Sequence, residues 1–166
     1  MLKKILVLGT WCLVLGMGIY LILPIPDFPP PPPGSLQSLE PADTESIYRK
    51  SYFTNMSRPE IMAMYDKSYS SPVQYRMDLP PESAYTVIRD QTRSSYLEEI
   101  IHPFRDSLYI NVFVPIKPTE QINRNGIHYL NKITVRQIPS RPMTRITVML
   151  LAGIVGYLII KEYQHV

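Results

Sequence analysis

The chain has 166 residues and a net charge of +3, from 17 Lys or Arg and 14 Asp or Glu. The excess of positive charge lies near the two ends, so the central region is almost neutral and lacks the basic face that nucleic-acid binding requires. The single cysteine, Cys12, excludes an internal disulfide, and the length leaves room for one small domain.

The first predicted element is a transmembrane helix over residues 1–23. Ile5 to Leu23 are uncharged, and as a helix they extend about 28 Å, close to the roughly 30 Å hydrocarbon core of a bilayer. Lys3 and Lys4 precede this run, as basic residues do in a secretory signal peptide. The sequence before Pro24 has no small-x-small cleavage site, so an uncleaved anchor is predicted, with a cleaved signal peptide as the alternative.

A proline-rich spacer and linker is expected over residues 24–46. The five consecutive prolines Pro29 to Pro33 favour a stiff polyproline II helix, which would hold the following domain away from the membrane. The alternative is that this tract docks into the aromatic-lined groove of another protein. Gly34 to Ser46 is polar and is predicted to be a flexible or partly ordered linker.

The central domain is predicted over residues 47–140, and it opens with a helix and a strand. Ser57-Arg58-Pro59-Glu60 fits a capping box with proline in the first turn, which predicts a helix from Arg58 to Lys67. Apolar and polar residues alternate from Val73 to Leu79, as in a strand with one buried face. A second helix is expected from about Glu82 to Gln91.

The rest of the central domain is predicted to be β-structure. Residues 96–102 fit either a helix or a strand, and a hairpin is preferred because a turn-like segment follows and Leu108 to Val114 then alternate. Asn125-Gly126 predicts a tight turn, and Ile127 to Ile138 reads as one long strand. The fold class is therefore α+β, a small mainly antiparallel sheet with two helices, flanked by N- and C-terminal transmembrane helices.

The second transmembrane helix is predicted over residues 143–161. Ile146 to Ile160 is an uninterrupted apolar-rich run, and Arg145 and Lys161 at its two ends can extend their charges toward water. Lys3 and Lys4 favour a cytoplasmic amino terminus. The prediction is a two-pass protein of the cell membrane with both termini cytoplasmic and the central domain outside.

The opposite orientation is the alternative for this topology. Arg136, Arg141 and Arg145 precede the second span, and basic residues usually stay on the cytoplasmic side. Because long translocated loops obey this charge rule weakly, the orientation with the domain outside is preferred.

No arrangement of residues with a specific chemistry is recognisable. The three histidines are scattered, and Glu98 with His102 is the nearest approach to a metal-ligand pair. The central domain has one glycine, Gly126, and therefore no glycine-rich phosphate-binding loop. We predict no catalytic residues, no cofactor and no metal, and hence a protein that is not an enzyme.

Candidate interaction residues come from the tyrosines of the central domain. Tyrosine combines a large apolar ring with a hydrogen-bonding hydroxyl and therefore serves both packed sheets and interaction surfaces. Most of these tyrosines are expected to pack in a thin core. Tyr48, Tyr52 and Tyr69 lie in less regular sequence around the first helix and are predicted to be surface contacts.

Small residues in the two spans are candidates for membrane helix packing. Ala152 and Gly156 form a small-x-x-x-small pair, and Gly9 and Gly16 recur seven residues apart. Such positions permit helices to approach closely. Association between the two spans, or with another copy of the chain, is expected.

The favoured function is that of a non-enzymatic envelope protein, an interaction or assembly module whose partners are the lipid bilayer and another protein or a second copy of itself. Ile138 to Arg145 resembles the proline-rich approach to the second span in polysaccharide co-polymerases, which implies an accessory role in polysaccharide assembly or export. That family's long helical middle region is not predicted here. A sensor input subunit without its own output domain is the third alternative.

Overall fold

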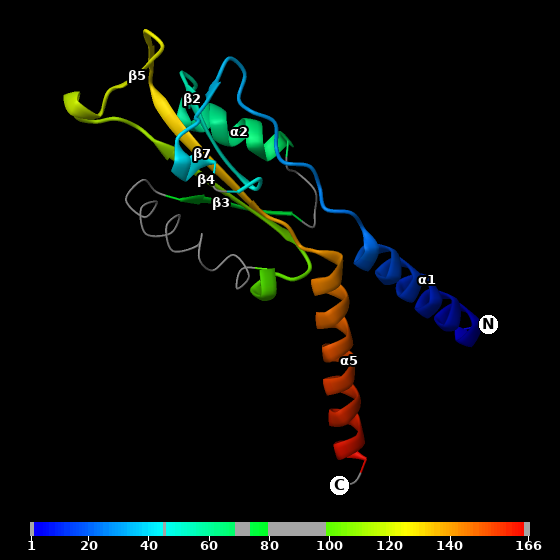
Figure 1. Ribbon diagram of the computed structural model, residues 1–166. Helices are drawn as coiled ribbons and strands as arrows, with labels where there is room; N and C mark the ends of the chain where they lie inside the picture. Colours follow the sequence, from blue (N-terminus) through cyan, green and yellow to red (C-terminus); the bar gives the residue numbers. More distant parts are fainter. Residues whose placement is uncertain (1, 45, 69–73, 80–98, 165–166) are drawn as a thin grey trace. The chain divides into compact units, whose positions relative to one another are not determined.

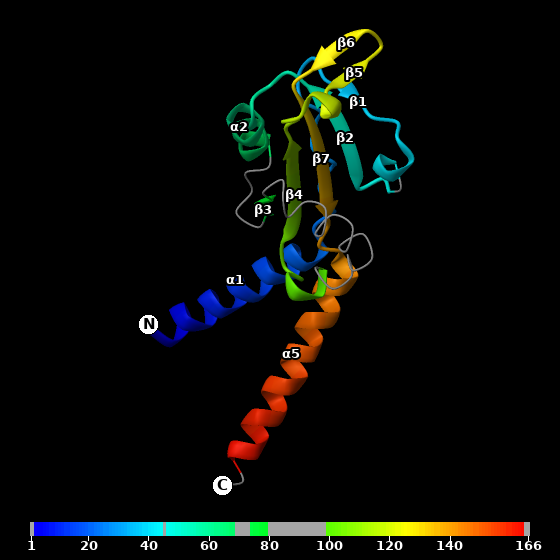
Figure 2. The same cartoon turned by 90° about the vertical axis from the view of Figure 1, so that its left-hand side faces the viewer.

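The computed structural model describes residues 2–44, 46–68, 74–79 and 99–164. It divides into two compact units. The helical unit comprises Met1–Pro26 and Ser140–Val166, and the sheet unit comprises Asp27–Pro139. Figures 1 and 2 show the elements of each unit.

The helical unit contains one helix from each end of the chain. Helix α1 spans Leu2–Ile22 and α5 spans Pro142–Tyr163, so at 1.5 Å per residue they are about 31 and 33 Å long. Both are long and apolar enough to cross a membrane. Other parts of the protein leave most of their apolar side chains uncovered. Side chains of this kind need an apolar solvent, which a bilayer provides. The two helices are compatible with a two-pass membrane protein.

The sheet unit is built on a five-stranded sheet in the order β1-β2-β7-β4-β3. All neighbouring pairs are antiparallel except β3 and β4, which run parallel. The strands are β1 (Leu36–Gln37), β2 (Arg49–Thr54), β3 (Gln74–Leu79), β4 (Asp106–Phe113) and β7 (Asn131–Ile138). The prediction of a small, mainly antiparallel sheet in an α+β domain is confirmed.

One helix, a hairpin of two short strands and two single-turn helices accompany the sheet in the described part of the sheet unit. Helix α2 spans Arg58–Ser68, as its capping box predicts, since the Glu60 carboxylate accepts hydrogen bonds from the Ser57 amide and hydroxyl at 2.8 and 2.6 Å. Strands β5 (Ile122–Arg124) and β6 (Ile127–Tyr129) form a separate hairpin. Its turn has positive φ at Asn125 and Gly126, as the Asn-Gly pair predicts. Two single-turn helices are η1 (Pro41–Asp43) and η2 (Pro118–Glu120).

The main core lies between α2 and the sheet (Figure 2). Ile61 and Tyr65 of α2 are fully buried against alternate residues of β4 and β7, with Tyr52 of β2. These alternate residues are Leu108, Ile110, Val112, Ile133 and Val135. A second, smaller cluster joins Phe53 to Ile122 and Tyr129 of the hairpin. Adjacent residues of β2 thus pack in two different cores, because successive side chains of a strand point to opposite faces.

The proline-rich segment groups with the sheet unit, and its role as a spacer stays a prediction. The compact unit begins at Asp27, well before the predicted boundary at residue 47. Pro29 and Pro32 are buried while the prolines between and after them are exposed. A polyproline II helix has three residues per turn, so these two rings lie on the same side of the segment. That side packs on the folded unit.

Two predictions of β-structure are wrong. Residues 99–101 are helical, so these residues do not form the expected strand, and β4 pairs with β7 and, in parallel, with β3. Ile127 to Ile138 is two strands rather than one, because Leu130 leaves the ladder and its amide donates to Asn55 Oδ1 at 3.0 Å. The helix predicted from Glu82 to Gln91 lies outside the described residues.

Candidate functional site

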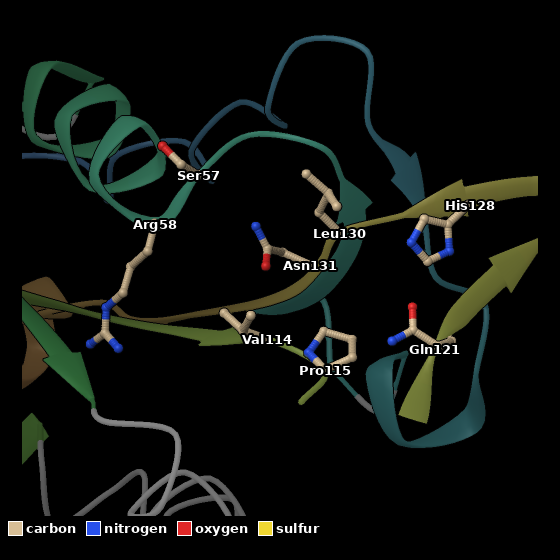
Figure 3. Close-up of a pocket in the computed structure, with 8 residues that line it drawn as sticks. All are labelled: Ser57, Arg58, Val114, Pro115, Gln121, His128, Leu130 and Asn131. Atoms are coloured by element: carbon tan, nitrogen blue, oxygen red, sulfur yellow. The ribbon is translucent and has the colours of Figure 1, made fainter. Parts of the chain in front are cut away.

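The sheet unit has a pocket between the start of α2, the end of β4 and the β5–β6 hairpin (Figure 3). We call it the hairpin pocket. Its volume is about 390 Å³, which lies within the range of small-ligand and peptide side-chain sites. The lining residues are Ser57, Arg58, Val114, Pro115, Gln121, His128, Leu130 and Asn131.

Side-chain hydrogen bonds to the backbone hold the walls of the hairpin pocket together. Asn131 donates from Nδ2 to the carbonyl of Met56 at 2.6 Å, and the Leu130 amide donates to Asn55 Oδ1 at 3.0 Å. Both bonds join the start of β7 to the loop between β2 and α2. On the opposite wall, His128 Nδ1 lies 3.1 Å from Asn123 Oδ1 across the hairpin. The pocket is therefore formed by structured segments in the protein as it stands.

Apolar side chains are exposed in and beside the hairpin pocket. The lining residues Val114 and Leu130 are each about half exposed, and next to lining residues in the sequence Ile116 is 88% and Ile127 about half exposed. Single exposed apolar residues are ordinary, but a contiguous apolar surface with a polar rim is typical of interaction sites. The lining residues include three amide or hydroxyl side chains and two basic ones, and no carboxylate. The pocket can accept an apolar group and offers hydrogen bonds at its edge.

A cluster of polar and charged side chains apart from the hairpin pocket joins η1 to β7. Asp43 is 4% exposed, and its carboxylate accepts hydrogen bonds from Ser38 Oγ at 2.6 Å and Ser51 Oγ at 2.7 Å. Lys132 Nζ lies 2.8 Å from Asp43 Oδ2 and 2.7 Å from Glu40 Oε2, and Arg124 pairs with the same Glu40 carboxylate. The described residues hold this carboxylate and this ammonium in a complete set of partners, which is the pattern of a structural ion pair.

The pKa shifts of this cluster follow from its geometry. Burial alone would raise the pKa of Asp43, but the hydrogen bonds from Lys132, Ser38 and Ser51 and the charge of Lys132 outweigh it, so the pKa is lowered. Burial alone would lower the pKa of Lys132, but Asp43 and Glu40 raise it. Both groups are therefore held in their charged forms, which stabilises the pair rather than preparing either group for proton transfer.

Of the three tyrosines predicted to be surface contacts, the structure buries Tyr52. Tyr52 is 3% exposed and packs in the main core, so it is not a surface contact. Its burial also raises the pKa of its hydroxyl. Tyr48 is half-buried and its carbonyl accepts the amide of Gln137 at 2.9 Å. Tyr69 lies outside the described residues.

The small residues of the two spans do not bring those helices together in this chain. A methyl group added at Gly9, Gly16 or Gly156 would meet no atom within 4 Å, and Ala152 is exposed. Their role in helix packing stays a prediction about contacts outside this chain.

Arg145 behaves differently from the expectation that its charge extends toward water. It is 4% exposed, and its guanidinium donates to carbonyls of both parts of the helical unit. Nη1 donates to Tyr20 O at 2.6 Å, Nη2 donates to Leu23 O at 2.7 Å, and Nε and Nη2 both donate to Ser140 O. The guanidinium carbon also lies 5.4 Å from the centre of the Tyr20 ring.

Neither the hairpin pocket nor the Arg145 contacts were foreseen from the sequence. Among residues 2–44, 46–68, 74–79 and 99–164 no group of three or more His, Cys, Asp or Glu is placed to hold a metal ion. The chain matches no family model, and no curated protein or solved structure is significantly similar to it. The function is therefore argued from the chain itself.

Proposed function

We propose that this protein is a membrane-anchored, non-enzymatic interaction module whose sheet unit binds another protein through the hairpin pocket. The observation that carries the proposal is the exposure of the apolar side chains Val114 and Leu130 in the lining of the pocket, with the exposed Ile116 and Ile127 each next to a lining residue in the sequence. Two terminal helices that are suited to a bilayer would confine this surface to a membrane. Confinement raises the effective concentration of a weak binding site toward partners in the same membrane.

The proposed orientation places both termini in the cytoplasm and the sheet unit outside. Lys3, Lys4 and Lys161 then lie on the cytoplasmic side, as the distribution of basic residues in membrane proteins favours. Of the three arginines before the second span that lie on the outer side in this orientation, Arg136 and Arg145 are buried. Structural requirements of the folded protein give a reason for their presence on that side, which weakens the main objection to this orientation.

A photo-cross-linking experiment tests the binding surface. The photoreactive amino acid p-benzoylphenylalanine replaces Ile116, which directly follows the lining residue Pro115, in the full chain in native membranes. In a control it replaces Ile47, which is 76% exposed and is neither a lining residue nor next to one in the sequence. We expect a discrete protein adduct from position 116 that is absent from position 47 and is lost when Leu130→Asp is added. The absence of a protein adduct at position 116, or equal adducts at both positions, would contradict the proposal.

The mass of the adduct identifies the class of partner. An adduct of twice the mass of the chain indicates self-assembly, and any other discrete mass indicates a different protein. A broad adduct that collapses on treatment with a glycan-cleaving enzyme would contradict the proposal and favour the polysaccharide role.

A further inference from the structure

The helical unit contains an arginine whose hydrogen bonds depend on the N-terminal helix. Arg145 lies in the first turn of α5, and two of its side-chain hydrogen bonds are accepted by Tyr20 and Leu23, at the C-terminal end of α1. The other two are accepted by Ser140, just before α5. The last carbonyls of a helix have no partner within that helix. A cation at this end also interacts favourably with the helix dipole.

The chemistry of arginine suits this position. The planar guanidinium presents five N–H donors in a fixed fork and stays charged, so one side chain can satisfy several carbonyls at once. The ring of Tyr20 lies against the same guanidinium. Arg145 is 4% exposed, so water does not supply the partners that α1 provides. Removal of residues 1–23 would take away two of these carbonyl acceptors and the Tyr20 ring that lies against the guanidinium, leaving Ser140 as the remaining acceptor among those contacts.

We infer that α1 is retained in the mature protein as a permanent anchor, and that Arg145 is the positioning residue that joins it to α5. A cleaved signal peptide has the same length, basic start and apolar run as α1. What distinguishes the two is a partner in the mature chain, and Arg145 is that partner. The inference does not depend on the hairpin pocket, so either can fail without the other.

Arg141 provides a matched control for Arg145. It lies four residues earlier, carries the same charge and is exposed. Its backbone carbonyl accepts the Arg145 amide as the first bond of α5, a role that any side chain leaves intact. Arg141→Gln and Arg145→Gln therefore remove the same charge from the same end of α5, and Arg145→Gln removes the side-chain bonds to Tyr20 and Leu23.

The experiment has two readouts on the full chain carrying a C-terminal tag and expressed in native membranes. The first is the intact mass of the purified protein, which we expect to include residues 1–23. The second is the distance distribution between spin labels on the native Cys12 of α1 and on Ala152→Cys of α5, both exposed positions. We expect one narrow distribution in the wild type and in Arg141→Gln, and its loss in Arg145→Gln.

Two results would overturn the inference. One is a mature chain that lacks residues 1–23. The other is a distribution in Arg145→Gln as narrow as in the wild type. If Arg145→Gln does not accumulate in the membrane, Arg145→Lys is measured in its place. Lysine keeps the charge but cannot present the same fork of donors, so the narrow distribution should again be lost, and its persistence would overturn the role of Arg145.

Discussion

We expect Lys132→Met to destabilise the sheet unit more than the loss of any other partly exposed charged side chain described above. The variant leaves the Asp43 carboxylate, 4% exposed, with two hydroxyl donors and no cation. Removal of one partner from a fully buried ion pair costs about 3–5 kcal/mol. The Lys132 side chain is 22% exposed, so part of that cost is relieved by water, and we expect a loss of about 2–3 kcal/mol.

Two further variants separate the ion pair from other effects of the mutation. Asp43→Asn leaves Lys132 paired with Glu40 and should cost about 1–2 kcal/mol. The double variant should cost less than the sum of the two single variants, since each removes the same interaction. Lys117→Met is the control, because Lys117 is 74% exposed and lies 3.9 Å from Glu120. Such an exposed surface pair contributes little to stability.

The assay is urea-induced unfolding of the full chain in detergent micelles, measured by pulse proteolysis of the folded fraction.

The pH dependence of the stability of Lys132→Met provides an independent check. The pKa of Asp43 is lowered below its ordinary value of 3.8, so its contribution to stability is present above pH 3.8 and is lost as the pH falls through the folded-state pKa. In Lys132→Met, burial would dominate and raise that pKa, so the deficit relative to wild type should shrink as the pH falls from 7 toward 4. Equal costs for Lys132→Met and Lys117→Met, or strict additivity with Asp43→Asn, would refute the reasoning.

The remaining predictions concern other packing and backbone features of the sheet unit and use the same assay. Tyr65→Phe should be neutral or stabilising by up to about 1 kcal/mol, because the fully buried Tyr65 hydroxyl has no hydrogen-bond partner among the described residues; a loss above this size would reveal a partner. Pro32→Ala should cost about 1–2 kcal/mol more than Pro31→Ala, because only the first ring is buried, and equal costs would contradict this packing of the tract. Gly126→Ala should cost about 1–2 kcal/mol, because φ is +77° at this position, and an unchanged midpoint would show that the turn tolerates a side chain.

Elements with a local signal were predicted correctly from the sequence. The capping box of Ser57 and Glu60 gives the start of α2, and the Asn125-Gly126 turn gives the β5–β6 hairpin. Each depends on a few adjacent residues whose chemistry favours one backbone conformation. The two terminal helices were also predicted from the sequence, because a long uncharged apolar run is compatible with few structures other than a long helix.

Strand β2 was missed because both of its faces are buried. Tyr52 packs in the main core and Phe53 packs in the second cluster, so the sequence has no alternation of apolar and polar residues. The packing of the proline tract was not predicted for a related reason. A polyproline II helix that packs on one side has the same sequence as a free one, and only the burial of Pro29 and Pro32 distinguishes them.

The hairpin pocket and the Arg145 contacts depend on residues that are distant in sequence. The pocket combines the start of α2 with residues from 114 to 131, and Arg145 bonds to a carbonyl 125 residues earlier in the chain. A basic residue at the edge of a span usually reaches toward water. Neither composition nor periodicity carries information about a partner at the far end of the chain.

The most direct test of the central claim is the sidedness of single cysteines introduced into a Cys12→Ser background. The positions are Ile47 and Thr119 in the sheet unit and Glu162 near the end of α5, all of them exposed. Intact cells are treated with a membrane-impermeant thiol reagent. Labelling of positions 47 and 119 in intact cells, with position 162 labelled only after permeabilisation, is the result predicted for a two-pass protein with its sheet unit outside. Labelling of all three positions in intact cells, or of position 162 alone, would contradict it.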